Sequence, residues 1–202
     1  TDVQADFVVP VPDSGVPAAL GYAEQSNKKF EFGLIRNHYV GRTFIEPTNN
    51  IRSLGVKLKL SSTKSIVKNK SIILIDDSLV RGTTCYKIVK MLYESGAKEV
   101  HVRIACPQIK YPDFYGVDMP TKEELLAHNK NIQEMCDHIK AKSLKFLSLS
   151  GLYTALIEEK RNSNYPQFSD HYFTGDYPIK PQDNLTGIRL KQLSLLSSKS
   201  NS

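Results

Sequence analysis

The sequence predicts an α/β domain with a mostly parallel central sheet, helices on both faces and one long functional loop. Strand-like and helix-like patterns alternate along the chain, which is typical of parallel sheets. Residues 72–75 are continuously apolar, as expected of a strand that is covered on both faces. A short Gly/Thr loop and a helical pattern follow them. This strand–loop–helix unit belongs at the carboxyl edge of the sheet, where open α/β folds bind ligands.

The first elements are predicted by short apolar runs. The run at 7–11 predicts the first strand, and residues 16–25 carry a helical pattern. A second short run, at 32–35, predicts another strand. Residues 37–64 are rich in Gly, Pro, Asn and Lys and have little periodicity. A connection of this length is unusual in a compact domain, so it is a candidate functional loop.

The later elements follow the same alternation. The helix after the strand at 72–75 reaches about Ser95, because Gly96 ends it. Expected next are a strand at 100–105, helices near 122–128 and 132–139, a strand at 144–149 and a helix from 151 to about 160. We therefore assign residues 1–160 to one domain. Residues 161–202 form a C-terminal extension that is partly irregular: residues 162–170 are polar and irregular, and the final Leu/Ser/Lys stretch is frayed or weakly helical.

Composition excludes several classes of protein. The 202 residues suffice for one α/β domain, alone or with appendages. No apolar run has the length of a membrane span, and no signal peptide opens the sequence. Cys85, Cys106 and Cys136 are odd in number and widely spaced, which argues against a disulfide framework or a zinc site. We expect a protein of the reducing cytoplasm that does not bind membranes.

Positive charge is concentrated in one part of the chain. Residues 28–90 hold 13 Lys/Arg and 4 Asp/Glu, a balance of +9 that exceeds the +6 of the whole chain. Such a field suits a small polyanion. No helix-turn-helix, aromatic RNA-binding motif or zinc pattern accompanies it, so nucleic acid is not the expected partner.

The loop after residues 72–75 combines anion-binding and acidic groups. The backbone N–H groups of residues 81–84 lie at a helix start and favour an anion, and Gly82 lets the backbone approach a phosphate. Asp76 and Asp77 repel phosphate, so they should face sugar hydroxyls or Mg²⁺. A ribose 5-phosphate satisfies both demands. A solvated acidic turn is the plain alternative, which the full string from 72 to 84 disfavours, and no Walker A motif is present.

Residues 76–84, Asp-Asp-Ser-Leu-Val-Arg-Gly-Thr-Thr, resemble the phosphoribosyl pyrophosphate (PRPP) signature of type I phosphoribosyltransferases. In detail they are similar to the glutamine PRPP amidotransferase family, which usually has Ile in place of Leu79. Residues 9–15 resemble the pyrophosphate loop of that family, and residues 36–45 resemble its flexible loop. Residues 114–120 and 123–128 resemble a family stretch after the next strand. The resemblance extends over most of residues 6–187.

The resemblance implies a type I phosphoribosyltransferase fold and a reaction in which ammonia displaces pyrophosphate from C1 of PRPP. The product is 5-phosphoribosylamine, in the first step of purine synthesis. Mg²⁺ is the implied cofactor, held by Ser14, Asp76 and Asp77. Carried over onto matching positions, the pyrophosphate site is Pro12, Asp13, Ser14 and Gly15, the 5-phosphate site is Ser78, Leu79, Val80, Arg81, Gly82, Thr83 and Thr84, and the loop residues that close over PRPP are Arg36, Tyr39 and Arg42.

The chain also departs from the family pattern. Arg36 replaces a usual Lys, and His38 replaces a usual Arg. Cysteines that bind a [4Fe–4S] cluster in some members are absent, since Tyr165, Phe168, Tyr172 and Asp113 stand in those places, so no cluster is expected. The chain starts at Thr1, a few residues before the first strand. We therefore expect the glutaminase domain, which releases ammonia from glutamine, to be absent, in a fragment or in a split or decayed gene product.

Other readings of the function remain open. The resemblance implies a homo-oligomer that purine nucleotides inhibit, although the sequence locates neither an interface nor a regulatory site. A non-catalytic module that binds PRPP or nucleotides is the main alternative, and a salvage transferase that uses a free base is another. The acid pair and both loops favour the enzyme. A regulator would carry a DNA-binding segment, and a salvage enzyme would carry a base-binding hood.

Overall fold

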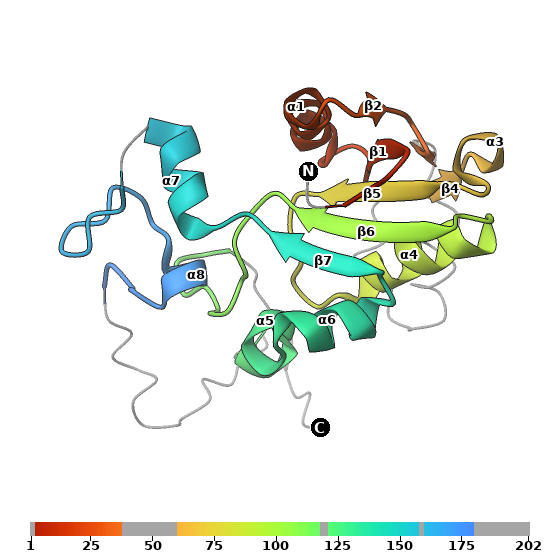
Figure 1. The fold of residues 1–202 in the computed structure, drawn as a ribbon. Coiled ribbons are helices and arrows are strands. Elements are labelled where there is room, and N and C mark those ends of the chain that lie inside the picture. Colours follow the sequence, from red (N-terminus) through yellow and green to blue (C-terminus); the bar gives the residue numbers. More distant parts are fainter. Residues whose placement is uncertain (1–2, 38–59, 118–120, 158–159, 180–202) are drawn as a thin grey trace, which may run out of the picture.

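A five-stranded parallel sheet forms the centre of the part of the chain that the structure describes (Figure 1). The structure is a computed structural model, and it describes residues 3–37, 60–117, 121–157 and 160–179. The strand order is β2-β1-β5-β6-β7, with every neighbouring pair parallel. The strands are β1 (Phe7–Pro10), β2 (Lys29–Phe30), β5 (Ser71–Asp76), β6 (Glu99–Ile104) and β7 (Ser143–Phe146).

Helices cover both faces of the sheet, as predicted. Helix α1 lies on one face, whereas α4 and α6 lie on the other (Figure 1). The short helix α3 precedes β5 in the chain, and η2 and α5 lie between β6 and α6. Helices α7 and α8 lie beyond the carboxyl ends of β6 and β7 (Figure 1). The bounds are α1 (Val16–Ser26), α3 (Lys64–Val67), α4 (Thr83–Glu94), the 3₁₀ helix η2 (Lys122–Glu124), α5 (Leu126–Asn129), α6 (Ile132–Ile139), α7 (Leu149–Ile157) and α8 (His171–Thr174).

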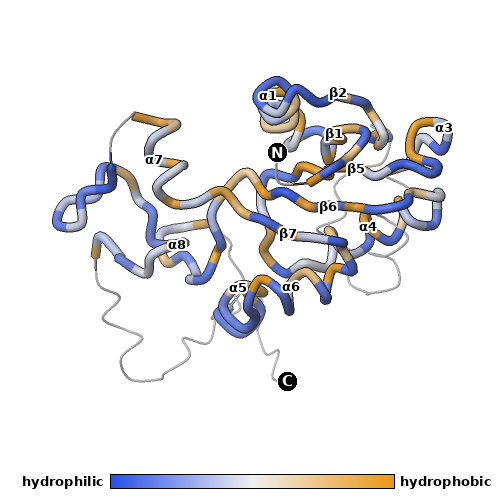
Figure 2. Tube along the Cα trace, viewed as in Figure 1, coloured by the Kyte–Doolittle hydropathy of each residue, from blue (hydrophilic) through white to orange (hydrophobic). Residues whose placement is uncertain are grey.

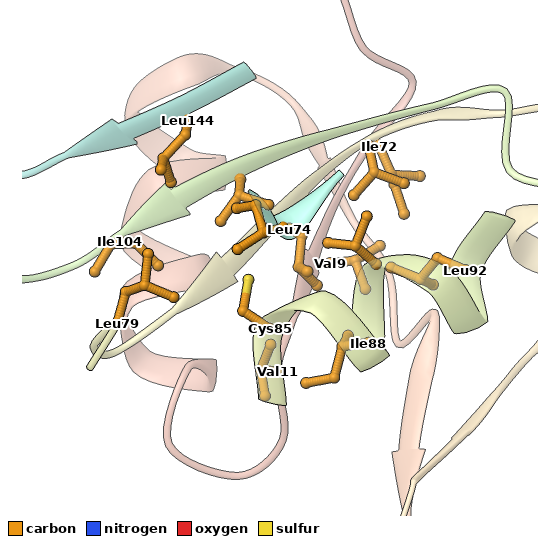
Figure 3. Close-up of a cluster of buried hydrophobic side chains, with 14 of the residues drawn as sticks. Val9, Val11, Ile72, Leu74, Leu79, Cys85, Ile88, Leu92, Ile104 and Leu144 are labelled. Carbon is orange, nitrogen blue, oxygen red and sulfur yellow. The ribbon is translucent and has the colours of Figure 1, made fainter. Parts of the chain in front are cut away.

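Strand β5 is buried along its whole length because its side chains alternate between two cores. Ile73 and Ile75 pack in the core beneath α1. Ile72 and Leu74 pack in the larger core, with Ile88 of α4 among its members (Figure 3). The continuous apolar run therefore predicted a doubly covered strand correctly.

The short strand expected at 32–35 is present two residues later than expected at its start, and it lies outside the parallel sheet. Strand β3 (Leu34–Arg36) pairs antiparallel with β4 (Leu60–Ser62) in a separate two-stranded sheet. The parallel sheet is instead extended by β2, whose two residues form too short a pattern to be recognised. Phe32 packs edge-on against Phe30, with ring centroids 4.9 Å apart. Most of the loop candidate at 37–64 lies outside the described residues.

The single helix expected near 122–128 is interrupted at Leu125. This residue has extended backbone (φ −73°, ψ 115°) and a fully buried side chain. The N–H of Leu126 donates to the carbonyl of Val80 at 2.9 Å. Packing against the loop before α4 thus overrides helix propensity here. Further along the chain, β7 is shorter than the strand expected at 144–149, and Leu149 already belongs to α7.

The segment 161–179 packs against α7 and against the connection that follows β6. Hydropathy changes from mainly hydrophobic in α7 to hydrophilic after it (Figure 2). The carboxylate of Asp170 is 4% exposed and accepts hydrogen bonds from the hydroxyl of Tyr153 at 2.9 Å and from Nε of Arg161 at 2.5 Å. The N–H of Lys110 donates to the carbonyl of Tyr172 at 2.8 Å. Within the described residues, no helix is both long and apolar enough to cross a membrane.

We expect Asp170→Asn to lower the free energy of unfolding by about 2 kcal/mol, because it removes a buried charged acceptor from Tyr153 and Arg161. Asp176→Asn is the matched control. Asp176 also binds Arg161, at 2.6 Å, but its side chain is 60% exposed, so its loss should cost less than about 1 kcal/mol. Urea unfolding of both variants measures the difference. Equal losses would contradict the central role of Asp170.

The stability that Asp170 contributes should depend on pH. Burial alone would raise its pKa, but hydrogen bonds from Arg161 and Tyr153 outweigh burial and leave the pKa below its ordinary value. A depressed folded-state pKa contributes stability that is present above the ordinary value of 3.8 and is lost as the pH falls through the folded value. Unfolding measured from about pH 6 to about pH 3 should show this loss in the native chain. The loss should be smaller in Asp170→Asn.

Candidate active site

Two loops begin side by side at the carboxyl edge of the sheet, after β1 and after β5. Pro10 is in register with Ile75 in the parallel pair. The N–H of Val11 then donates to the carbonyl of Ile75 at 2.8 Å, which continues the pairing by one residue into the first loop. The parallel register therefore brings together residues that are more than sixty positions apart in the sequence.

The first loop, residues 11–15, is a tight turn packed on the end of β5. The N–H of Gly15 donates to the carbonyl of Val11 at 2.9 Å, and the Pro12–Asp13 peptide bond is cis. A Cβ atom at Gly15 would lie 2.5 Å from the carbonyl oxygen of Ile75 and 2.9 Å from that of Val11. Both are backbone atoms, so the position accepts only glycine. Asp13 and Ser14 are exposed at the tip of the turn.

Arg36, from the sequence-predicted flexible loop, reaches this turn. Its Nη1 donates to Oδ2 of Asp13 at 2.6 Å. Arg36 lies at the end of β3, so the small second sheet positions it beside the turn. Tyr39 and Arg42, the other two loop residues singled out in the sequence, lie outside the described residues.

The second loop opens with two carboxylates in different environments. Asp76 is 9% exposed, and its Oδ1 accepts the N–H of Asp77 at 2.9 Å. Burial, together with the neighbouring charge of Asp77, raises the pKa of Asp76 to about 7. Asp77 is exposed and accepts a hydrogen bond from the hydroxyl of Ser78 at 2.9 Å.

The acid pair fits a cation. No Lys or Arg in the described ranges forms an ion pair with Asp76 or Asp77, so within those ranges no basic side chain compensates the charge of the pair. A hard divalent ion such as Mg²⁺, which prefers carboxylate oxygens, would supply that compensation. The described residues contain no cluster of three or more His, Cys, Asp or Glu side chains arranged to hold a metal. Besides the two acids, oxygen ligands for such an ion could come from the Ser14 hydroxyl, the substrate and water.

The remainder of the second loop leads into α4. Gly82 has a positive φ of 77°, and α4 begins at Thr83. Thr83 and Thr84 are both exposed. The helix start expected in this loop is therefore present, and the anion-binding role of residues 81–84 stays a prediction. The side chain of Leu79 is buried in the core (Figure 3), so only its backbone can contact a ligand.

Two neighbours of this loop were not recognised from the sequence. Glu124 of η2 accepts a hydrogen bond from Nε of Arg81 at 3.2 Å. Leu126 packs so closely that a Cβ at Gly82 would lie 2.7 Å from its Cδ2. An open hollow of about 220 Å³ adjoins the start of α4 and is lined by Thr83, Tyr86, Lys87 and His138. The only sequence signal for Glu124 was its place in a segment that resembles the family.

The resemblance places Asp113 where iron–sulfur members of the family carry a cysteine, and in the structure its carboxylate contacts a histidine. Its Oδ1 lies 2.7 Å from Nε2 of His171, and both side chains are buried. The backbone N–H groups of Tyr115 and Val117 donate to Oδ2. Burial would raise the pKa of Asp113, but these hydrogen bonds lower it overall. That the chain binds no [4Fe–4S] cluster stays a prediction, which iron analysis of the purified protein would test.

A parallel α/β sheet with these two loops at its carboxyl edge defines a type I phosphoribosyltransferase fold. The family model described as phosphoribosyl transferase domain matches residues 2–143, and the chain belongs to this family. It is homologous to the phosphoribosyltransferase domain of amidophosphoribosyltransferases. The amidophosphoribosyltransferase of Rhizobium etli is 55% identical over 197 residues, which are 97% of this chain and 40% of that protein. The chain thus spans about two fifths of that relative.

Solved structures give the same result. Glutamine PRPP amidotransferase from B. subtilis, complexed with ADP and GMP, matches with a TM-score of 0.79 and 46% identity, over 91% of this chain and 40% of that one. A structure described as the allosteric regulatory enzyme of purine biosynthesis matches with a TM-score of 0.78 and 47% identity, over 91% of this chain and 39% of that one. The predicted family and fold are therefore confirmed.

Proposed function

We propose that the chain binds PRPP at the carboxyl edge of β1 and β5 and transfers its phosphoribosyl group to ammonia. The reaction would release pyrophosphate and form 5-phosphoribosylamine. The observation that carries this proposal is the contact between the first loop and the end of β5, through Val11, Gly15 and Ile75, directly before the acid pair that opens the second loop. PRPP has a pyrophosphate at one end and a 5-phosphate at the other, so it needs two anion-binding loops around one ribose.

Each loop has a distinct role in this proposal. The backbone of Pro12–Gly15 receives the pyrophosphate, and residues Ser78–Thr84 hold the 5-phosphate. Ser14, Asp76 and Asp77 would hold Mg²⁺, with the two acids also facing the ribose hydroxyls. When bound, Mg²⁺ would neutralise the leaving pyrophosphate. Arg36, with Tyr39 and Arg42, would close over the substrate and exclude water.

The chemistry needs charge placement more than a strong base. The C1–O bond to pyrophosphate breaks with its electron pair going to the leaving group, and the lone pair of ammonia forms the C1–N bond. The product ammonium then gives up a proton to solvent. Positive charge develops on the ribose in the transition state, and the fixed carboxylates of Asp76 and Asp77 stabilise it.

Further parts of the proposal rest on the relatives. We assign residues 1–160 to the phosphoribosyltransferase domain and 161–202 to its extension. Glutamine would serve as nitrogen source only through a glutaminase domain, which the resemblance to the glutamine PRPP amidotransferase family implies for the complete enzyme. A relative is described in complex with ADP and GMP, so purine nucleotides are candidate inhibitors of this chain as well. A non-catalytic module that binds PRPP or nucleotides is the second candidate.

A comparison of acceptors tests the proposal. Pyrophosphate release from PRPP is measured with Mg²⁺ and saturating ammonia, then with glutamine, then with a panel of free purine and pyrimidine bases. We expect pyrophosphate release with ammonia, and no release with glutamine or with any free base. Release only with a free base would assign a salvage transferase instead. If PRPP binds but no acceptor causes release, the chain is a non-catalytic module that binds PRPP.

A further inference from the structure

The segment 121–126, here called the brace, packs against the proposed 5-phosphate loop, residues 78–84. The N–H of Leu126 donates to the carbonyl of Val80 at 2.9 Å, and the side chain of Leu126 packs against Gly82. Leu125 is fully buried and anchors the segment. The brace therefore fixes the backbone on both sides of Arg81.

Glu124 adds a side-chain contact to this brace. Its Oε1 accepts from Nε of Arg81 at 3.2 Å, while its Oε2 accepts the N–H of Thr121 at 3.2 Å. The hydrogen bond from Arg81, followed by the one from Thr121, lowers the pKa of Glu124, so the carboxylate is ionised at neutral pH. Because the second oxygen is held by the backbone of its own turn, the carboxylate has a defined orientation toward Arg81.

The contact leaves the far end of Arg81 available to a ligand. Glu124 engages only Nε, and among the described residues Nη1 and Nη2 of Arg81 make no hydrogen bond. A guanidinium is a planar fork, so fixing the Nε edge also fixes the direction of the terminal nitrogens. Paired terminal N–H groups suit the oxygens of a phosphate.

We propose that Glu124 is a positioning residue that orients Arg81 toward the 5-phosphate of PRPP; this inference rests on the proposed function. The side chains of Arg81 and Glu124 are 51% and 49% exposed, and ion pairs of this kind contribute little to stability. We therefore expect the contact to affect the PRPP dissociation constant more than the stability of the fold. A general electrostatic effect has the opposite sign, because removing an acid beside an anion site should strengthen PRPP binding.

The test compares the PRPP dissociation constants of the native chain, Glu124→Gln and Glu123→Gln, measured by titration calorimetry with Mg²⁺. Glu123 is the matched control, since it is the adjacent exposed acid in the same turn. Both variants remove one negative charge. We expect Glu124→Gln to weaken PRPP binding about threefold, the size of an exposed ion pair, and Glu123→Gln to leave it unchanged or slightly stronger. The same comparison in an Arg81→Ala background should show no effect of Glu124→Gln.

The outcomes separate the possibilities. Weaker binding for Glu124→Gln only when Arg81 is present supports the positioning role. Unchanged or stronger binding, or an equal loss in the Arg81→Ala background, overturns it. If the native chain does not bind PRPP, the proposed function itself is overturned, and the role of Glu124 with it. As a readout without ligand, the Arg81 Nε–H resonance in the NMR spectrum should shift in Glu124→Gln and not in Glu123→Gln.

Discussion

Asp76→Asn is expected to reduce pyrophosphate release from PRPP by at least about a hundredfold while leaving the chain folded. The substitution keeps the shape of the side chain but removes the buried negative charge that would face the metal and the ribose. The fold should survive because burial already disfavours the charged form of Asp76. Steady-state release with saturating ammonia measures the effect, and far-UV circular dichroism measures the fold.

Asp137→Asn is the control for this experiment. Asp137 lies on α6 and accepts a hydrogen bond from Gln133 on the surface, so its loss should leave release unchanged. Near-native release by Asp76→Asn would place the chemistry elsewhere in the chain. Equal losses in the two variants would show only a general sensitivity to charge.

Gly15→Ala is expected to remove most PRPP-dependent activity and to lower the free energy of unfolding by about 2 kcal/mol. The new methyl group would lie 2.5 Å from the carbonyl oxygen of Ile75, so either the turn or the end of β5 must move. Because this contact seats the first loop on the end of β5, directly before the acid pair, the movement would displace the pyrophosphate loop from that pair. A displacement near 1 Å can cost about a hundredfold in rate.

Gly21→Ala provides the control for the glycine substitution. A Cβ at Gly21 meets nothing within 4 Å, and the residue lies inside α1. Alanine there should leave activity unchanged and stabilise the helix by up to about 1 kcal/mol. Native-like activity of Gly15→Ala would contradict the requirement of the site for close packing of the first loop on the end of β5.

The sequence predicted the parts of the fold whose pattern is local. Residues 72–75 are continuously apolar, and Gly82 and Thr83 follow within one loop, so strand, loop and helix start were all recognisable. The register of β1 and β5 then explains why the two expected loops meet at one edge. Strand β2 was missed because two residues carry no usable pattern.

Contacts between residues that are distant in the sequence could not be predicted from it. The partners Arg36 and Asp13 are 23 positions apart, and Arg81 and Glu124 are 43 apart. Such pairs are set by packing of whole elements, and no local propensity encodes them. The break at Leu125 has the same origin. The hydrogen bond between the N–H of Leu126 and the carbonyl of Val80, in the loop before α4, overrides the helical pattern.

Titration of PRPP into the native chain and into Gly15→Ala, with and without Mg²⁺, tests most directly whether the two loops form one PRPP site. We expect a single class of site in the native chain, tighter binding with Mg²⁺, and a large loss of affinity in Gly15→Ala. Absence of binding to the native chain, or binding that Gly15→Ala leaves intact, would contradict it.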